Sequence, residues 1–298
     1  MMRKIIFLIM VLCSCLVTNA KHIATGGNHN LVIKADGSLW AWGDNSKGQV
    51  GNGESGDGKY LFSPVKIMDG VVQVTAGAHH TLAIKTDGSL WAWGYNNYGQ
   101  VGNGESSWDN CQASPVKIMD GVTQVAAGAY HTLAIKTDGS LWAWGDNDSG
   151  QLGNGESGWN KNQTSPVKIM EGVAQVATGA YHTLAIKTDG CLWAWGNNNY
   201  GQVGNGESGN GKEQTSPVKI MDGVAQVTAG DDHTLAIMTD GSLWAWGRNN
   251  NGKLGDGTLN QRTTPIKIMS NIVQASAGKD HSVALSSDNT LYGCGSRP

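Results

Sequence analysis

Short runs of alternating apolar and polar residues recur along this chain. In the segment 80–85, every second side chain, beginning with His80, would lie on one face of an extended strand and the others on the opposite face. Three more strands are expected nearby, at 74–77, 90–93 and 114–119. No segment has the period of 3.6 residues that an amphipathic helix requires. The pattern therefore predicts an all-β protein.

The residues between these runs predict tight antiparallel hairpins. Asp87-Gly88 joins two strand-like runs, and Asp-Gly at such a place predicts a type I′ turn, which needs positive φ at both central residues. Pro115 suits the start of a strand or an edge strand, because proline has no amide hydrogen to donate to a neighbour. A second Asp-Gly turn, at 120–121, would begin the next unit.

This arrangement repeats along the chain. The segment Asp-Gly-Ser-Leu-Trp-Ala-Trp-Gly occurs five times almost unchanged, and its second tryptophan recurs every 51 residues, at Trp42, Trp93, Trp144, Trp195 and Trp246. The repeats span about 22–72, 73–123, 124–174, 175–225 and 226–273, with a partial copy at 274–298. A period of this length indicates a repeat array in which each unit buries its apolar surface against a neighbour.

Four short antiparallel strands per repeat are typical of a β-propeller blade. Both faces of each predicted sheet carry apolar residues, as expected if every blade lies between two others. The repeated tryptophans are therefore interpreted as packing between blades. The 43 glycines recur at fixed positions of the period and so mark turns.

The repeat resembles that of the regulator-of-chromosome-condensation family, which includes bacterial proteins described as alpha-tubulin-suppressor-like. The matching motifs are Ala-Gly-Ala-Tyr-His-Thr-Leu-Ala-Ile at 127–135, Asp-Gly-Ser-Leu-Trp-Ala-Trp-Gly at 138–145 and Gly-Gln-Leu-Gly-Asn-Gly at 150–155. The resemblance covers essentially all of 22–298 and implies a β-propeller, typically of seven blades.

The copy number departs from seven. The half-repeat from histidine to tryptophan occurs six times, the last in a degenerate form at 291–295. The proline-containing strand occurs only five times, at Pro64, Pro115, Pro166, Pro217 and Pro265. We therefore predict six blades of which one is a strand short, and the sequence leaves open a seven-bladed ring or an open arc.

The N-terminal segment departs from the repeat. Residues 1–20 combine a short basic region at Arg3 and Lys4, an apolar run and small residues ending at Ala20, which is typical of a secretory signal peptide. A lipoprotein signal with an acylated Cys15 is the alternative. We expect a propeller domain at 21–298 that is secreted, periplasmic or on the cell surface, with no membrane span.

Charge argues against a nucleic-acid partner. Removing residues 1–20 takes away Arg3 and Lys4 and no acidic residue, which leaves 19 basic against 24 acidic residues and a formal charge of −5. Phosphate binding needs clustered lysine and arginine.

Several motifs that suggest chemistry are better explained by the scaffold. Loops beginning at Gly51, Gly153 and Gly204 match the Gly-x-Gly-x-x-Gly pattern, but no helix follows them, so no nucleotide cofactor is expected. One repeat position holds six histidines, interpreted as structural hydrogen-bonding groups: His29, His80, His131, His182, His233 and His281. No catalytic constellation or metal-ligand spacing is found, so we expect a non-enzyme without cofactor or metal.

The positions at which the repeats differ are the candidates for function. The variable loops carry aromatic residues among Asn, Ser, Gly and Asp, a composition suited to protein recognition. Neutral drift after duplication is the competing interpretation. The candidate partner-binding residues are Tyr95, Tyr98, Trp108, Tyr130, Trp159, Tyr181 and Tyr200.

These observations favour a secreted, non-enzymatic interaction module that binds an unknown protein or glycan. The resemblance adds two alternatives, a guanine-nucleotide-exchange regulator and a secreted inhibitor like the family's β-lactamase-inhibitor propeller. The export signal, the acidic balance and the near-uniform repeats argue against exchange.

Overall fold

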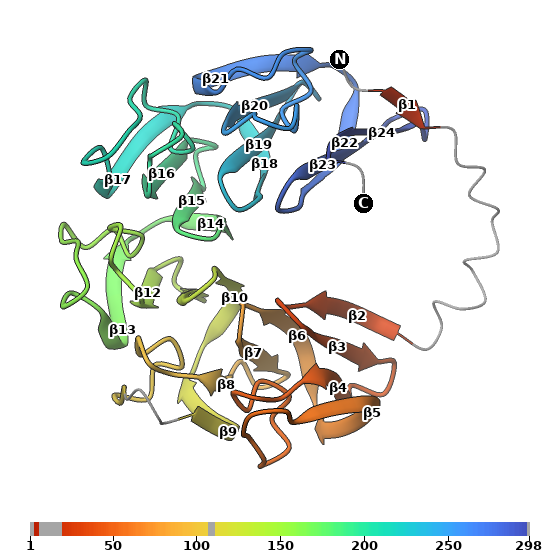
Figure 1. Cartoon of the computed structure of the whole chain (residues 1–298), viewed down its shortest axis with the longest axis vertical. Coiled ribbons are helices and arrows are strands. Elements are labelled where there is room, and N and C mark those ends of the chain that lie inside the picture. Colours follow the sequence, from red (N-terminus) through yellow and green to blue (C-terminus); the bar gives the residue numbers. More distant parts are fainter. Residues whose placement is uncertain (1–2, 6–19, 107–110, 297–298) are drawn as a thin grey trace. The chain divides into compact units, whose positions relative to one another are not determined.

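The computed structural model describes residues 3–5, 20–106 and 111–296, and all regular elements in these ranges are β-strands (Figure 1). The strands form six separate antiparallel sheets of four strands each. The predicted all-β fold with four-stranded blades is confirmed. The chain divides into two compact units, which are described one at a time.

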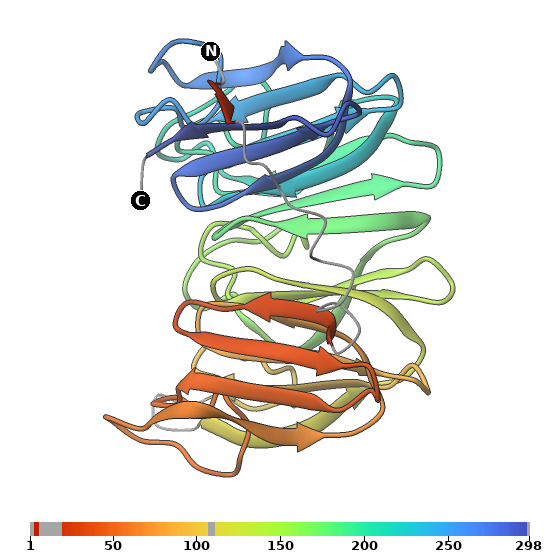
Figure 2. The same ribbon diagram turned by 90° about the vertical axis from the view of Figure 1, so that its right-hand side faces the viewer.

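The N-terminal unit comprises 20–106, 111–148 and 159–171 of the described residues and contains three sheets. The first, seen nearly face-on in Figure 2, is β2 (Ala20–Thr25), β3 (His29–Lys34), β4 (Leu39–Asp44) and β5 (Tyr60–Met68). The second is β6 (Val71–Ala76), β7 (His80–Lys85), β8 (Leu90–Tyr95) and β9 (Cys111–Met119). The third is β10 (Val122–Ala127), β11 (His131–Lys136), β12 (Leu141–Gly145) and β13 (Gln163–Met170).

The C-terminal unit comprises 149–158, 172–296 and the short segment 3–5 of the described residues. Its first sheet is β14 (Val173–Thr178), β15 (His182–Lys187), β16 (Leu192–Gly196) and β17 (Gln214–Met221). Its second is β18 (Val224–Ala229), β19 (His233–Met238), β20 (Leu243–Gly247) and β21 (Arg262–Met269). Its third contains β22 (Ile272–Ala277), β23 (His281–Ser286) and β24 (Leu291–Gly295).

The fourth strand of this last sheet comes from outside the repeats. The repeat region supplies only three strands here, as its copy number predicts. Strand β1 (Arg3–Ile5) pairs antiparallel with β24, with Lys4 opposite Tyr292. The predicted signal peptide and its boundary after Ala20 remain predictions. Its apolar run and Cys15 lie outside the described residues.

The hairpins between the second and third strands of each sheet form where predicted, but the predicted type I′ turn was wrong. Gly88 has a positive φ of +76°, whereas the φ of Asp87 is not positive. The amide of Gly88 donates to the carbonyl of Lys85, and the amide of Lys85 donates to the carbonyl of Ser89. This is a type I turn followed by one left-handed glycine. The Asp87 carboxylate favours it by accepting from the Ser89 amide at 2.9 Å and hydroxyl at 2.6 Å.

The fourth strand of each repeat lies at the edge of its sheet. In the second sheet, β9 begins at Cys111, before the predicted start, and Pro115 falls beside a register shift opposite Ala92 and Gly94. An irregularity on an edge strand accommodates a residue without an amide hydrogen.

The hydrophobic core of each unit lies between consecutive sheets. In the N-terminal unit, Leu31 and Leu39 of the first sheet pack with Val74 and Trp93 of the second, and all four side chains are at most 1% exposed. Trp93 lies directly on Gly51 of the preceding repeat, where an added Cβ would approach the indole nitrogen to 2.5 Å. The same arrangement recurs in the C-terminal unit around Trp246. The tryptophans thus join neighbouring sheets.

Candidate functional site

A chain of hydrogen bonds links four of the repeated histidines to the next sheet. The Nε2 atom of His29 lies 2.9 Å from the hydroxyl of Thr81, which donates to the carbonyl of Gln49 at 2.8 Å. The indole of Trp93 donates to the same carbonyl at 3.0 Å. Because the threonine hydrogen is directed at the carbonyl, His29 donates from Nε2. Equivalent bonds to threonine or serine are made by His80, His182 and His233.

Burial keeps these histidines uncharged. It lowers the pKa of His80 and of His233 to about 3, and that of His29 and of His182 to about 4. All four are therefore neutral near pH 7. Their position between sheets and their use of Nε2 explain why a histidine recurs here. Within the ranges that the structure describes, no group of three or more His, Cys, Asp or Glu side chains is placed to hold a metal ion.

The two ends of the repeat series depart from this network. Trp42 is only half-buried, and His281 is exposed, unlike the other histidines of its series. Cys294 stands where a tryptophan would be, and its thiol donates to the carbonyl of Lys253 at 3.1 Å. Burial raises the pKa of this thiol to about 11, so it remains protonated.

Three of the seven predicted partner-binding residues come together in the N-terminal unit. Tyr95 ends β8, Tyr98 lies in the loop that follows, and Tyr130 directly precedes β11. His79, directly before β7, joins them. The ring centroids of Tyr98 and Tyr130 are 5.3 Å apart, and those of Tyr95 and Tyr130 are 6.0 Å apart. We call His79, Tyr95, Tyr98 and Tyr130 the aromatic cluster.

The aromatic cluster is half-buried and held by polar contacts. The amide of Asn97 donates to the Tyr95 hydroxyl at 2.7 Å, and the backbone amide of Tyr98 donates to the Gln100 side chain at 3.0 Å. Burial, followed by the nearby carboxylate of Asp146, raises the pKa of Tyr98. Burial also lowers the pKa of His79. Near neutral pH, the His79 ring is therefore uncharged and the Tyr98 hydroxyl remains protonated.

The other four predicted residues have no contact with this cluster that the structure describes within one unit. The position of Trp108 is not among the described residues. Trp159 belongs to the N-terminal unit and is 78% exposed. Tyr181 and Tyr200 belong to the C-terminal unit, where Tyr181 is 37% exposed and Tyr200 stacks with Arg248. Whether these seven residues serve one binding surface stays a prediction.

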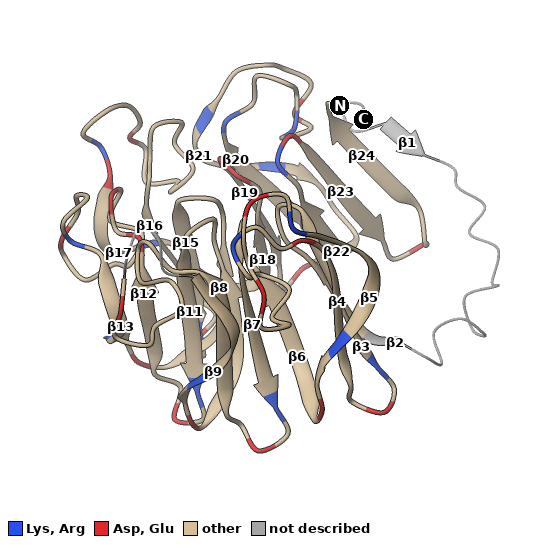
Figure 3. Ribbon diagram, turned by 60° about the horizontal axis from the view of Figure 1, so that its bottom comes forward, with Lys and Arg blue, Asp and Glu red and all other residues tan. Residues whose placement is uncertain are grey.

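In the last repeats of the C-terminal unit, charged residues occupy some of the matching positions. The Arg248 guanidinium lies 4.4 Å from the ring centroid of Tyr200 and 3.1 Å from the Asp232 carboxylate. Lys253 replaces the glutamine of other repeats. Its buried ammonium lies 2.6 Å from Asp280, which lowers the pKa of that carboxyl. We call Asp232, Arg248, Lys253 and Asp280 the charged cluster. Figure 3 shows charged residues concentrated in loops and at strand ends, while most of each strand carries none.

A comparison of the repeats within the sequence identifies the positions of the charged cluster, but it does not predict which of these residues contact one another. Asp232 and Arg248 stand at positions that vary between repeats, and Lys253 is visible as a replaced glutamine. Nothing in the sequence indicates which variable loops meet. Which loops meet depends on how neighbouring repeats pack, and this is seen only in the folded structure.

The model of the family described as "RCC1-like domain" matches residues 10–297, nearly the whole chain. This chain belongs to the RCC1-like domain family. The predicted resemblance to regulator-of-chromosome-condensation repeats is therefore confirmed.

Several proteins of known name or structure are similar to this RCC1-like chain. The ultraviolet-B receptor UVR8 of Arabidopsis thaliana is 35% identical over 249 residues, which cover 80% of this chain and 55% of the receptor. Human RCC2 is 30% identical over 262 residues, 74% of this chain and 48% of RCC2. The chain thus spans about half the length of these two relatives.

Solved structures show the same fold. Human WBSCR16 matches with a TM-score of 0.77 and 26% identity, covering 89% of this chain and 71% of that protein. Yeast RCC1 (Prp20), solved bound to Kap60, matches with a TM-score of 0.77 and 24% identity, covering 92% of this chain and 69% of that protein. The RCC1-like chain accordingly has the β-propeller fold, and its described residues form six four-stranded sheets. In the part described, no helix has the length and apolar character needed to cross a membrane.

Proposed function

We propose that this RCC1-like chain is a non-enzymatic protein-binding module and that the aromatic cluster is its main contact surface. The observation that supports this most directly is the contact between the rings of His79, Tyr95, Tyr98 and Tyr130, which come from a strand end and loops of two neighbouring blades. These rings occupy positions that vary between repeats, so they are not required to build a blade.

The geometry suits recognition of a protein surface. Adjacent rings restrict one another, so less rotamer freedom is lost when a partner binds. Tyrosines offer a large apolar area together with a hydroxyl group, the combination that is enriched at the energetic centres of interfaces. The neighbouring Asn97 and exposed Asp148 add polar groups around the rings.

The similar proteins support the proposal that this domain is a binding module, because the same kind of domain occurs in proteins of different function. Similar segments occur in a light receptor and in ubiquitin-protein ligases, where they form 55% of UVR8 and 5% of human HERC2. A part found in such different proteins fits a binding function better than one particular reaction.

We further propose that the chain acts outside the cytoplasm, on the basis of residues 1–20. The intact mass of the exported protein would test this, since cleavage removes those residues.

The binding proposal is tested by affinity capture with the purified full chain, followed by a titration with each captured protein. The double variant Tyr98→Ala/Tyr130→Ala should weaken binding by about a hundredfold, as expected for the loss of two central aromatic contacts. Asp232→Ala is the matched control, because Asp232 stands at the same repeat position as Tyr130 but carries no aromatic ring and belongs to the C-terminal unit. Unchanged binding by a correctly folded double variant would refute the proposal.

A further inference from the structure

A cavity of about 370 Å³ opens among the loops of the C-terminal unit, and no residue of the aromatic cluster lines it. Tyr200, from the loop between β16 and β17, forms one side. The remaining lining comes from the loop between β20 and β21: Arg248, Asn249, Asn250, Leu259, Asn260 and Gln261. Its volume is within the range of small-molecule sites in proteins.

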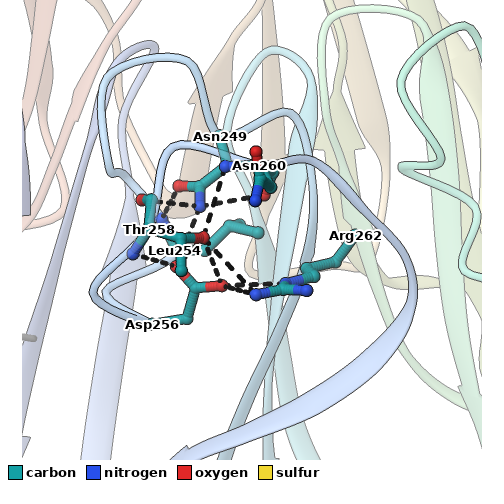
Figure 4. A network of polar contacts seen from close by, with 6 residues as sticks. All are labelled: Asn249, Leu254, Asp256, Thr258, Asn260 and Arg262. Atoms are coloured by element: carbon teal, nitrogen blue, oxygen red, sulfur yellow. Dashed lines mark hydrogen bonds and ion pairs between the residues drawn. The ribbon is translucent and has the colours of Figure 1, made fainter.

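The wall of this cavity is held in place by its own hydrogen bonds, drawn in Figure 4. The side-chain amide of Asn249 donates to Asp256 at 3.0 Å and to the carbonyls of Thr258 and Asn260 at 3.1 Å. The guanidinium of Arg262 binds the second oxygen of Asp256 at 2.6 Å. Asp256 and Arg262 replace the asparagine and glutamine found in most other repeats, and the loop is shorter. The ion pair therefore fixes a loop shape peculiar to this repeat.

The positive charge at the cavity is already neutralised. Arg248 is held between the Tyr200 ring, 4.4 Å away, and the carboxylate of Asp232, 3.1 Å away. A ligand carboxylate would compete with Asp232 for this guanidinium and would gain little net attraction. Yet the Arg248 side chain remains 34% exposed, so it can donate a hydrogen bond to an uncharged oxygen.

The rest of the lining combines amides with an apolar rim. Asn250, Asn260 and Gln261 are exposed, and each side chain has both a donor and an acceptor. Gln261 also donates to the Ser208 hydroxyl at 3.2 Å. Leu259 is 67% exposed at this site. Amides match hydroxyl groups, which also donate and accept, while Leu259 and Tyr200 can cover C–H surfaces.

We propose that this cavity binds a neutral saccharide. Its hydroxyl groups would bind Asn250, Asn260 and Gln261, and its apolar ring face would lie against Tyr200 and Leu259. The cavity shares no residue with the aromatic cluster, so this RCC1-like chain would bind a sugar and a protein through different residues, one set in each unit.

The test is isothermal titration of the purified full chain with neutral hexoses, N-acetylhexosamines and their short oligomers. Glucuronate and succinate serve as carboxylate probes. At least one neutral saccharide should bind, and Tyr200→Ala and Asn260→Ala should each weaken that binding by about tenfold, a loss typical of one good contact. Asn260→Ala provides a second variant that leaves the stack of Tyr200 and Arg248 intact.

Tyr98→Ala is the matched control, because Tyr98 stands at the repeat position of Tyr200 but belongs to the aromatic cluster. It should leave saccharide binding unchanged, so this test is independent of the proposed protein binding. The absence of heat with every neutral saccharide would overturn the proposal. Binding restricted to glucuronate or succinate would also overturn it, as would saccharide affinity that neither Tyr200→Ala nor Asn260→Ala changes.

Discussion

Directly before the repeated histidine, two copies in the N-terminal unit carry His79 and Tyr130, whereas two copies in the C-terminal unit carry Asp232 and Asp280. The first pair lies in the aromatic cluster and the second in the charged cluster. Beneath both, a histidine, a threonine or serine and a backbone carbonyl connect neighbouring blades. The difference shows that the same frame supports unrelated loop chemistry, because the histidine, hydroxyl and carbonyl bonds of the frame use no side chain of either cluster.

The largest expected effect is on stability. It tests whether the bonds between blades contribute equally to stability in the two units. Trp93 and Trp246 are both fully buried, and each indole donates to a glutamine carbonyl at 3.0 Å. Trp93→Ala and Trp246→Ala should each lower the free energy of unfolding by about 3–5 kcal/mol. Urea denaturation measures this. Trp42→Ala is the control and should have a smaller effect, since Trp42 is half-buried. A clear difference between the two buried positions would contradict an equivalent frame.

A smaller effect on the free energy of unfolding is expected when the pH is lowered. An unfolded histidine binds a proton near pH 6.5, whereas His80 and His233 have pKa values of about 3 in the folded chain. Between these values the unfolded chain binds more protons, so stability is complete above pH 6.5 and falls as the pH decreases. Each histidine should remove about 1.4 kcal/mol per pH unit in this window.

Urea denaturation at several pH values measures this slope. His80→Asn and His233→Asn should reduce it by equal amounts, one in each unit. His281→Gln is the control, because His281 is exposed. An unchanged slope in both asparagine variants would show that acid acts on other groups.

The smallest effect concerns a repeat position that is changed in one copy, which belongs to the C-terminal unit. In the N-terminal unit, the Trp142 indole donates to the Ser140 hydroxyl at 2.9 Å. In the C-terminal unit, Cys191 replaces this serine, and the buried Trp193 indole nitrogen has no partner among the described residues. The Cys191 thiol instead donates to Asp222 at 2.8 Å, and that bond is the first cause raising its pKa to about 11.

Restoring the repeat residue should repair this site. Cys191→Ser should raise the Tm by about 2 °C, as expected for one hydrogen bond gained in a chain of this size. The reciprocal change, Ser140→Cys, should lower the Tm by a similar amount. Differential scanning calorimetry measures both. A decrease in Tm for Cys191→Ser would show that the thiol bond to Asp222 matters more.

Much of the fold could be predicted because the same pattern is present in several copies. The strand alternation beginning at His80 and the buried role expected for Trp93 both follow from the period. The turn type could not be read from Asp87-Gly88 alone, because the carboxylate bonds to Ser89 favour a different turn. Strand β1 had no repeat pattern to reveal it, since it contains only three residues in a segment typical of a signal peptide.

The candidate site could be predicted only in part. Tyr95, Tyr98 and Tyr130 are recognisable as aromatic departures from the repeat, and the structure brings them together. The residue at the position of His79 also varies between repeats, but no residue pattern groups this histidine with the tyrosines. The pairing of Asp256 with Arg262 depends on the path of a shortened loop, which has no residue-level signature.

The pairing of β1 with β24 also affects how the chain folds. These strands lie at opposite ends of the described sequence, so their sheet reaches four strands only after nearly the whole chain has been synthesised. Contacts between such distant residues form slowly because a long loop must close first. If residues 1–20 are removed during export, β1 is removed with them, and one side of β24 becomes an unpaired edge to which another extended chain can add.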